Sequence, residues 1–283
     1  MKRIAILGPG LIGGSIALAL RRAGGSHVTL WARRAEAVGE VIASGCADTA
    51  TADFAGAVKD AGLVVLCVPV GAMGDVARKI APVISPSCVV TDVGSVKAPV
   101  LAELRPVFAG RARFVGSHPM AGSEHTGLAA ARANLFDGTT CIVTPDADTD
   151  AAALTAVCDF WKGIGCRVAE LPAAEHDECV ALVSHLPHLL AATLINTVAA
   201  QNGHAFRVVG PGFRDTTRVA AGPPAMWREI LRENSAAVLP AIDALIAKLA
   251  DFRQTLAPAA DGNGTHELLA AARATRERIT FPK

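Results

Sequence analysis

The spacing of hydrophobic and polar positions changes partway along the chain. Up to residue 171, short apolar runs rich in β-branched side chains alternate with longer stretches in which apolar residues recur at helical spacing. The predicted strands are Arg3–Leu7, His27–Trp31, Leu63–Val68, Cys88–Thr91, Arg113–Gly116, Cys141–Thr144 and Arg167–Glu170. Strands and helices that alternate in this way predict a mostly parallel sheet with helices on both faces.

Beyond Leu171 and Pro172 the strand pattern stops, and apolar residues keep helical spacing through the rest of the chain. Glycine and proline cluster at 210–212 and 222–224, and helices are predicted at 173–197, 225–256 and 266–279. Pro187 should kink the first of these helices. We therefore expect an α/β domain over residues 1–171, followed by an all-α domain over residues 172–283.

A glycine-rich segment, GPGLIG, runs from Gly8 to Gly13 directly after the first predicted strand. Gly8 permits a tight turn, Gly10 lets a pyrophosphate approach the backbone, and Gly13 lets the next helix pack against the sheet. Leu11 and Ile12 begin that helix, whose unpaired N–H groups and positive dipole end attract phosphate. The fold class expected is thus an α/β, Rossmann-type dinucleotide-binding domain followed by an all-α C-terminal domain.

The end of the second predicted strand distinguishes the two nicotinamide cofactors. Enzymes that use NAD usually carry Asp or Glu there, whereas this chain has Ala32 followed by Arg33 and Arg34. Two guanidinium groups suit the 2′-phosphate of NADP, so we expect NADP, with NAD as the second choice. Val68 and Pro69, at the end of another strand, and Ser95 are also expected beside the cofactor. The alternative is that both arginines are solvated residues at the start of a helix.

Composition and charge argue against several classes of protein, such as those that bind nucleic acid or membranes. The 283 residues carry 27 Lys and Arg against 26 Asp and Glu, and this balance argues against a nucleic-acid partner or an anionic membrane surface. We identify no apolar segment long enough to span a bilayer and no signal peptide, so we expect a cytoplasmic protein. The seven cysteines form no C-x-x-C pair and are expected to be buried, reduced thiols. The chain has no tyrosine, which excludes the Tyr-Lys chemistry of many short-chain reductases.

Polar residues gather where the predicted strands end, which is where parallel sheets bind their ligands. The segments are TDVGSVK, from Thr91, and GSHP, which contains His118. His118 does not lie on a core face, and a neutral imidazole can take a proton near pH 7, so it is the candidate general base. Ser95 can cap the next helix, and Lys97 is expected to be a solvated residue of its first turn.

The spacing of His185 and His188 allows a shared helix face that could bind a metal ion. No acid or cysteine lies at an obvious spacing for a third ligand, and Pro187 separates the two histidines. We therefore expect no metal site.

Five segments together resemble the prephenate/arogenate dehydrogenase family of tyrosine biosynthesis. They read GPGLIGGS, TDVGSVK, GSHPMAGSEHTG, EHDECVALVSHLPH and GFRDTTRVAAGPPAMW. The resemblance extends over nearly the whole length of the chain. The resemblance implies oxidative decarboxylation of arogenate, prephenate or both, in which hydride passes from ring C4 to the nicotinamide and carbon dioxide leaves as the ring aromatises. Because NADP use leans toward arogenate, we expect arogenate or dual specificity. We also expect a homodimer through the helical domain.

The resemblance also implies roles for individual residues. His118 matches the catalytic histidine, and Ser95 matches the serine that bonds this histidine and the substrate hydroxyl. Arg218 matches the arginine that binds the substrate carboxylate, although it could instead form a surface salt bridge. The other expected substrate-binding residues are His188, Trp227, Arg214, and the acids Glu124 and Asp177, which match acids at the mouth of the pocket.

Two other classes of protein share part of this pattern. β-Hydroxyacid dehydrogenases join a Rossmann domain to a helical one but use a lysine on the first long helix, where this chain has His185 and His188. A non-catalytic NADP-sensing protein would bind the cofactor without needing His118, Ser95 and Arg218 together.

Overall fold

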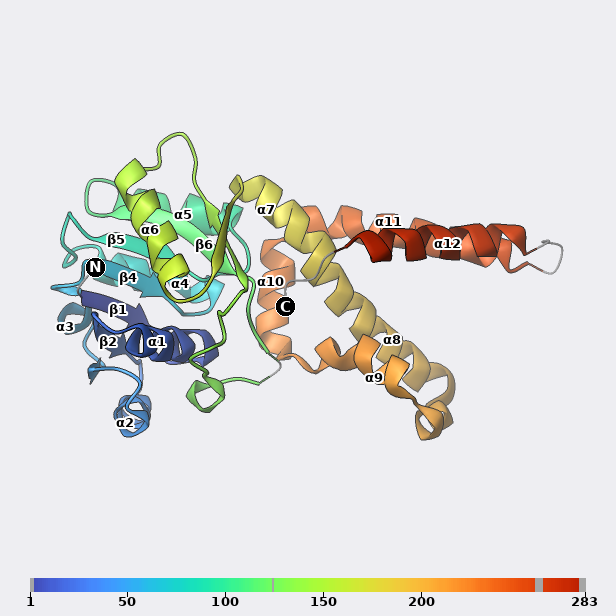
Figure 1. Ribbon diagram of the computed structural model, residues 1–283, viewed down its shortest axis with the longest axis horizontal. Coiled ribbons are helices and arrows are strands. Elements are labelled where there is room, and N and C mark those ends of the chain that lie inside the picture. The colour runs from blue at the N-terminus through green and yellow to red at the C-terminus, as the bar shows by residue number, and fades with distance from the viewer. Residues whose placement is uncertain (1–2, 124, 258–261, 280–283) are drawn as a thin grey trace.

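The computed structural model describes residues 3–123, 125–257 and 262–279. A sheet domain forms one end of the molecule, and a helical unit extends away from it (Figure 1). The last strand ends at Glu170 and the first helix of the helical unit begins at Ala173. An α/β, Rossmann-type domain followed by an all-α region, as predicted, is confirmed.

Within the described residues, eight strands form one sheet in the order β3-β2-β1-β4-β5-β6-β7-β8. The strands are β1 (Arg3–Leu7), β2 (His27–Trp31), β3 (Thr49–Thr51), β4 (Leu63–Leu66), β5 (Val89–Asp92), β6 (Arg113–Pro119), β7 (Thr140–Thr144) and β8 (Arg167–Glu170). All neighbouring strands run parallel except the antiparallel pair β6 and β7. The seven predicted strands are present, and β3 is the strand that the sequence analysis missed.

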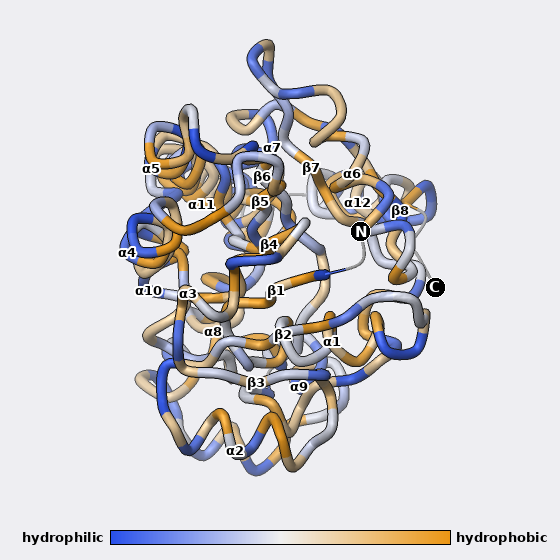
Figure 2. Tube along the Cα trace, turned by 90° about the vertical axis from the view of Figure 1, so that its left-hand side faces the viewer, coloured by the Kyte–Doolittle hydropathy of each residue, from blue (hydrophilic) through white to orange (hydrophobic). Residues whose placement is uncertain are grey.

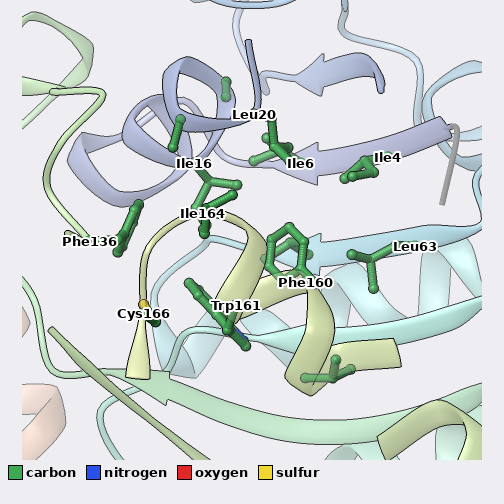
Figure 3. Packing of buried hydrophobic residues seen from close by; sticks show 14 of the residues in the cluster. Ile4, Ile6, Ile16, Leu20, Leu63, Phe136, Phe160, Trp161, Ile164 and Cys166 are labelled. Atoms are coloured by element: carbon green, nitrogen blue, oxygen red, sulfur yellow. The ribbon is translucent and has the colours of Figure 1, made fainter. Parts of the chain in front are cut away.

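Helices cover both faces of the sheet, as the buried apolar residues require. They are α1 (Leu11–Ala23), α2 (Ala35–Ser44), α3 (Phe54–Val58), α4 (Val70–Ile80), α5 (Ala98–Phe108) and α6 (Ala151–Gly163). Figure 3 shows one core, where Ile16 of α1 and Phe160 and Trp161 of α6 approach Ile4 and Ile6 of β1. A second core packs α3, α4 and α5 against the opposite face. Strand β1, hydrophobic along most of its length, runs between these layers (Figure 2).

The helical unit begins with one long, interrupted helix. Its elements are α7 (Ala173–Val180), a π-helical turn (Ala181–His185) and α8 (Leu186–Asn202), then α9 (Pro211–Thr217), α10 (Pro224–Glu233), α11 (Ser235–Thr255) and α12 (Asn263–Arg278). The predicted break near Pro187 is a π-turn that ends just before it, and Pro187 lies in the first turn of α8, where its missing N–H costs little. The cluster at 210–212 starts α9, because proline is also favoured at the first position of a helix.

One stretch of helical turns, Ala173–Val208, is long and apolar enough to cross a membrane by length and composition, and 28% of its most apolar window is buried. The sequence analysis missed this because it ended the helix at residue 197. The stretch carries the buried polar residues His176, Asp177 and His185. Two of them bond to the sheet domain, as described below, so its first turns are an integral part of the protein's own fold.

Candidate active site

His118 lies at the carboxyl end of β6, and 9% of its surface is exposed. Its Nδ1 atom is 2.8 Å from Nε2 of His176, and Nδ1 of His176 is 2.8 Å from Oδ1 of Asp177. Both partners belong to α7, so the first helix of the helical unit completes the surroundings of a side chain on the sheet. His176 was not predicted as a site residue. The only signal in the sequence was its position next to Asp177, and this was too weak to assign it a role.

Asp177 does not lie at the mouth of the pocket as expected, because only 5% of its surface is exposed. Its carboxylate accepts the backbone N–H of Lys97 at 2.7 Å and that of Ala98 at 2.8 Å, where α5 begins. A helix N-terminus leaves such amides unpaired and favours negative charge. Asp177 therefore caps α5 from another domain. The N-cap residue of α5 is Lys97, so Ser95 does not occupy the cap position that was its alternative role.

Lys97 is fully buried, which contradicts the expectation of a solvated residue. Its ammonium group donates to a carboxylate oxygen of Asp92 and, at 2.8 Å, to the carbonyl of Ser117. Asp92 also accepts the N–H of Gly94 at 2.8 Å and that of Ser117 at 3.2 Å. A buried charge of this kind persists only when it is paired and hydrogen-bonded. The network fixes the ends of β5 and β6, and therefore the backbone that carries His118.

His118, His185 and His188 all have pKa values below the ordinary value of a histidine. Burial first, and then the neighbours His176, Lys97 and His185, hold the pKa of His118 well below its ordinary value of 6.5. Burial also lowers the pKa of His185 to about 4. The pKa of His188 is lowered too, again mainly by burial. His118 is thus an imidazole with a free lone pair, the form that a general base requires.

A second group of side chains comes from α8 and α10. The rings of His188 and Trp227 stack with centroids 3.6 Å apart, so two predicted substrate-binding residues do lie together. His188 Nδ1 is buried with no hydrogen bond to any residue in the described part of the chain. His185 accepts from the amide of Asn234 at 3.1 Å, and the same amide donates to the carbonyl of Asp177 at 2.8 Å. Asn234, which the sequence analysis missed, thus joins the two groups.

The remaining predicted residues lie on less enclosed parts of the molecule. Ser95 is half-buried in the loop between β5 and α5, and Arg218 is exposed in a 3₁₀ turn, Arg218–Ala221, that packs on α8. Arg214 is exposed, and its guanidinium group pairs with the neighbouring Asp215 at 3.1 Å. Glu124 lies outside the described residues.

The glycine-rich turn has the shape that a dinucleotide requires. Gly8 has φ of +125°, and a Cβ on Gly8 or Gly13 would strike backbone atoms, whereas a Cβ on Gly10 would meet nothing within 4 Å. The open space at Gly10 lies before the N-terminus of α1, which has no side-chain cap and no acidic residue in its first turn, so the amides of Leu11 and Ile12 can face a phosphate. The residues present therefore fit a nucleotide cofactor.

The other predicted cofactor residues border the same edge of the sheet. Strand β1 lies between β2 and β4, and the strand order reverses direction there, which is where such sheets bind nucleotides. Ala32 is buried, while Arg33 and Arg34 are exposed at the start of α2. Val68 and Pro69 follow β4, and Pro69 immediately precedes α4.

Residues 16–170 match the family model of the prephenate dehydrogenase nucleotide-binding domain, and residues 172–271 match that of the prephenate dehydrogenase dimerization domain. The chain belongs to the prephenate dehydrogenase family. It is 40% identical to the cyclohexadienyl dehydrogenase of Zymomonas mobilis over 261 residues, which cover 90% of this chain and 89% of that relative.

Two solved structures of the family are similar in fold. Prephenate dehydrogenase from Aquifex aeolicus, in complex with hydroxyphenyl propionate and NAD⁺, is 32% identical and superposes with a TM-score of 0.91 over 99% of each chain. Arogenate dehydrogenase from Synechocystis is 29% identical, with a TM-score of 0.84 over 98% of this chain and 100% of the other. The reaction of this family member is an NAD(P)-dependent oxidative decarboxylation of prephenate, arogenate or both.

Proposed function

We propose that His118 is the general base of this oxidative decarboxylation. The observation that carries the proposal is a neutral imidazole at the carboxyl end of β6 whose Nδ1 is already bonded to His176. Within the described residues the only hydrogen bond of the His118 ring is made by Nδ1, so Nε2 is left to take the proton of the C4 hydroxyl. A bound nicotinamide would supply the acceptor for the hydride that leaves ring C4. The protein supplies position and a proton acceptor, while aromatisation supplies the driving force.

We propose that Arg218 binds a substrate carboxylate, because a guanidinium group offers planar, paired donors to it. Support comes from its place in the turn that packs on α8, the helix that carries His188. The stacked rings of His188 and Trp227 form an adjoining wall, and Ser95 follows β5 at the same edge of the sheet as His118. Arg214 and Glu124 remain proposed contacts of the substrate, whereas Asp177 is assigned a different task below.

We propose that the preferred cofactor is NADP and that the substrate is arogenate or both cyclohexadienyl acids. Ala32 leaves no acid to repel a 2′-phosphate, and Arg33 and Arg34 lie exposed beside it. Dual use is supported by the relatives, one named for cyclohexadienyl compounds and another for arogenate.

We propose that two copies associate through the helical unit. Large apolar side chains are exposed there, among them Leu182, Val183, Leu239, Ile246, Leu249 and Leu256. A surface of this kind on a soluble protein marks a contact site, and the matching family model is described as a dimerization domain.

We also propose a cytoplasmic location, since all seven cysteines are free. The expectation that they are all buried is wrong for Cys67, which is half-buried, and for Cys179, which is exposed.

An activity assay tests the proposal. Purified protein receives prephenate or arogenate with NADP or NAD, and reduction of the cofactor is followed by absorbance. We expect turnover with arogenate at least, and faster turnover with NADP. Absence of turnover with both substrates would contradict the reaction, and a preference for NAD would contradict the role of the two arginines.

A further inference from the structure

The side chains around His118 form a chain of hydrogen bonds whose direction can be worked out. Asp177 is a carboxylate that accepts two backbone N–H groups, so it can only accept from His176 as well. The Nδ1 atom of His176 therefore carries the hydrogen. In an uncharged His176 the Nε2 atom is then an acceptor, and Nδ1 of His118 must donate to it. This leaves Nε2 of His118 unprotonated.

We propose that His176, held by Asp177, is a positioning residue that fixes the tautomer and orientation of His118. The proposal deepens the function proposed above and rests on His118 as the base. It assigns to α7 a task in the chemistry: the helical unit selects which nitrogen of a histidine on the sheet is basic. A histidine of the wrong tautomer would present an N–H to the substrate hydroxyl and could not take its proton.

Asp177, the last residue in this series of hydrogen bonds, is itself held by several groups. Two amides at the start of α5 bind the carboxylate of Asp177, and the side chain of Asn234 binds its backbone carbonyl. The rings of His118 and His176 meet edge to face, with centroids 5.1 Å apart and an angle of 69° between their planes. A fixed acceptor at a fixed angle restrains the rotation of the His118 ring.

The arrangement also places a negative charge near the positive charge that His118 gains in the reaction. When the O–H bond of the substrate breaks and an N–H bond forms at Nε2, His118 becomes an imidazolium. Ionisable groups near it include Lys97, the N-cap residue of α5, His185 from the π-turn and Cys141 of β7, and Asp92 at the end of β5 pairs with Lys97. The Lys97 ammonium is already paired with Asp92. The carboxylate of Asp177, one imidazole away, is the available counter-charge for the new cation.

Nuclear magnetic resonance of protein carrying isotope-labelled histidine tests the tautomer without any catalysis. The signals of His118 are assigned from their loss in His118→Asn, and the spectra are recorded at pH 7.5 in the absence of substrate. We expect the chemical shift of a protonated nitrogen at Nδ1 and of an unprotonated one at Nε2. The opposite tautomer would overturn the inference even if the enzyme is active, whereas an inactive enzyme with the expected tautomer would refute only the proposed function.

Steady-state kinetics of two substitutions at His176 distinguish a role in positioning His118 from a role in folding alone. His176→Ala removes the acceptor and should lower kcat by about 10²-fold with little change in KM. His176→Gln returns a carbonyl oxygen that can accept from Nδ1 of His118, so it should recover about tenfold of that loss.

His27→Asn, at an exposed histidine at the start of β2, is the matched control and should keep the wild-type kcat. Cofactor binding and thermal unfolding are measured for all three variants. If both variants at His176 lose activity equally while remaining folded, or if neither loses it, the positioning role is wrong.

Discussion

Replacing Asp177 with alanine should destabilise the protein far more than removing an ordinary helix cap. Its carboxylate satisfies the N–H groups of Lys97 and Ala98 at 2.7 and 2.8 Å in a buried position between the two domains. An exposed N-cap contributes about 1 kcal/mol, whereas each buried N–H that loses its partner costs about 1–3 kcal/mol. The bond from Lys97 is buried and that from Ala98 is partly buried, so we expect the free energy of unfolding to fall by about 2–3 kcal/mol.

Asp53 provides a matched comparison. It caps α3 through the N–H groups of Ala55 at 3.1 Å and Gly56 at 2.8 Å, but it is exposed, and within the described residues its carboxylate bonds only to its own helix. Asp53→Ala should therefore cost about 1 kcal/mol. Urea unfolding, followed by tryptophan fluorescence and by circular dichroism, measures both variants. If the two substitutions lower stability equally, the argument that burial and the contact between domains set the cost of losing Asp177 is refuted.

Four further outcomes are expected of the active site. His118→Asn should lower kcat by about 10³-fold or more while NADP affinity, measured by fluorescence titration, stays near the wild-type value; retained activity would place the base elsewhere. Because the pKa of His118 is held well below 6.5 and the base must be unprotonated, kcat/KM should stay level as pH falls through 6.5 and decline only at lower pH; a decline centred at or above pH 6.5 would contradict this. Arg218→Ala should raise KM for substrate far more than it lowers kcat, and an unchanged KM would remove Arg218 from the site. Ala32→Asp should shift the ratio of kcat/KM values toward NAD, and an unchanged ratio would reject the phosphate pocket.

Much of the fold could be predicted because its signals are local. The seven predicted strands are short runs made mostly of apolar residues, and the glycine turn needs only its own backbone to bring Gly13 against Gly8. Strand β3 was missed because it has only three residues, Thr49–Thr51. It lies at the edge of the sheet and pairs with β2 alone, so it has no long apolar run. The position of His118 followed from the rule that strand ends gather at one edge of a sheet.

The interior of the site could not be predicted, because its contacts join distant parts of the chain. Lys97 carries no local sign that it turns inward to Asp92, and a lysine in the first turn of a helix is usually solvated. His176 lies 58 residues from His118, and Asp177 lies 80 residues from Lys97. Their roles depend on how the helical unit docks against the sheet, and the hydrophobic pattern of either domain alone does not encode this.

The π-turn of Ala181–His185 holds one more residue than an α-helical turn would need for the same advance. Everything after it, including His188, is therefore rotated about the helix axis relative to His176. Deleting a single residue from this turn would let α7 and α8 merge into one regular helix and swing the downstream face by about 100°. The two imidazole groups would then face different directions, so a relative that lacks this extra residue would need another way to build the wall formed by His188.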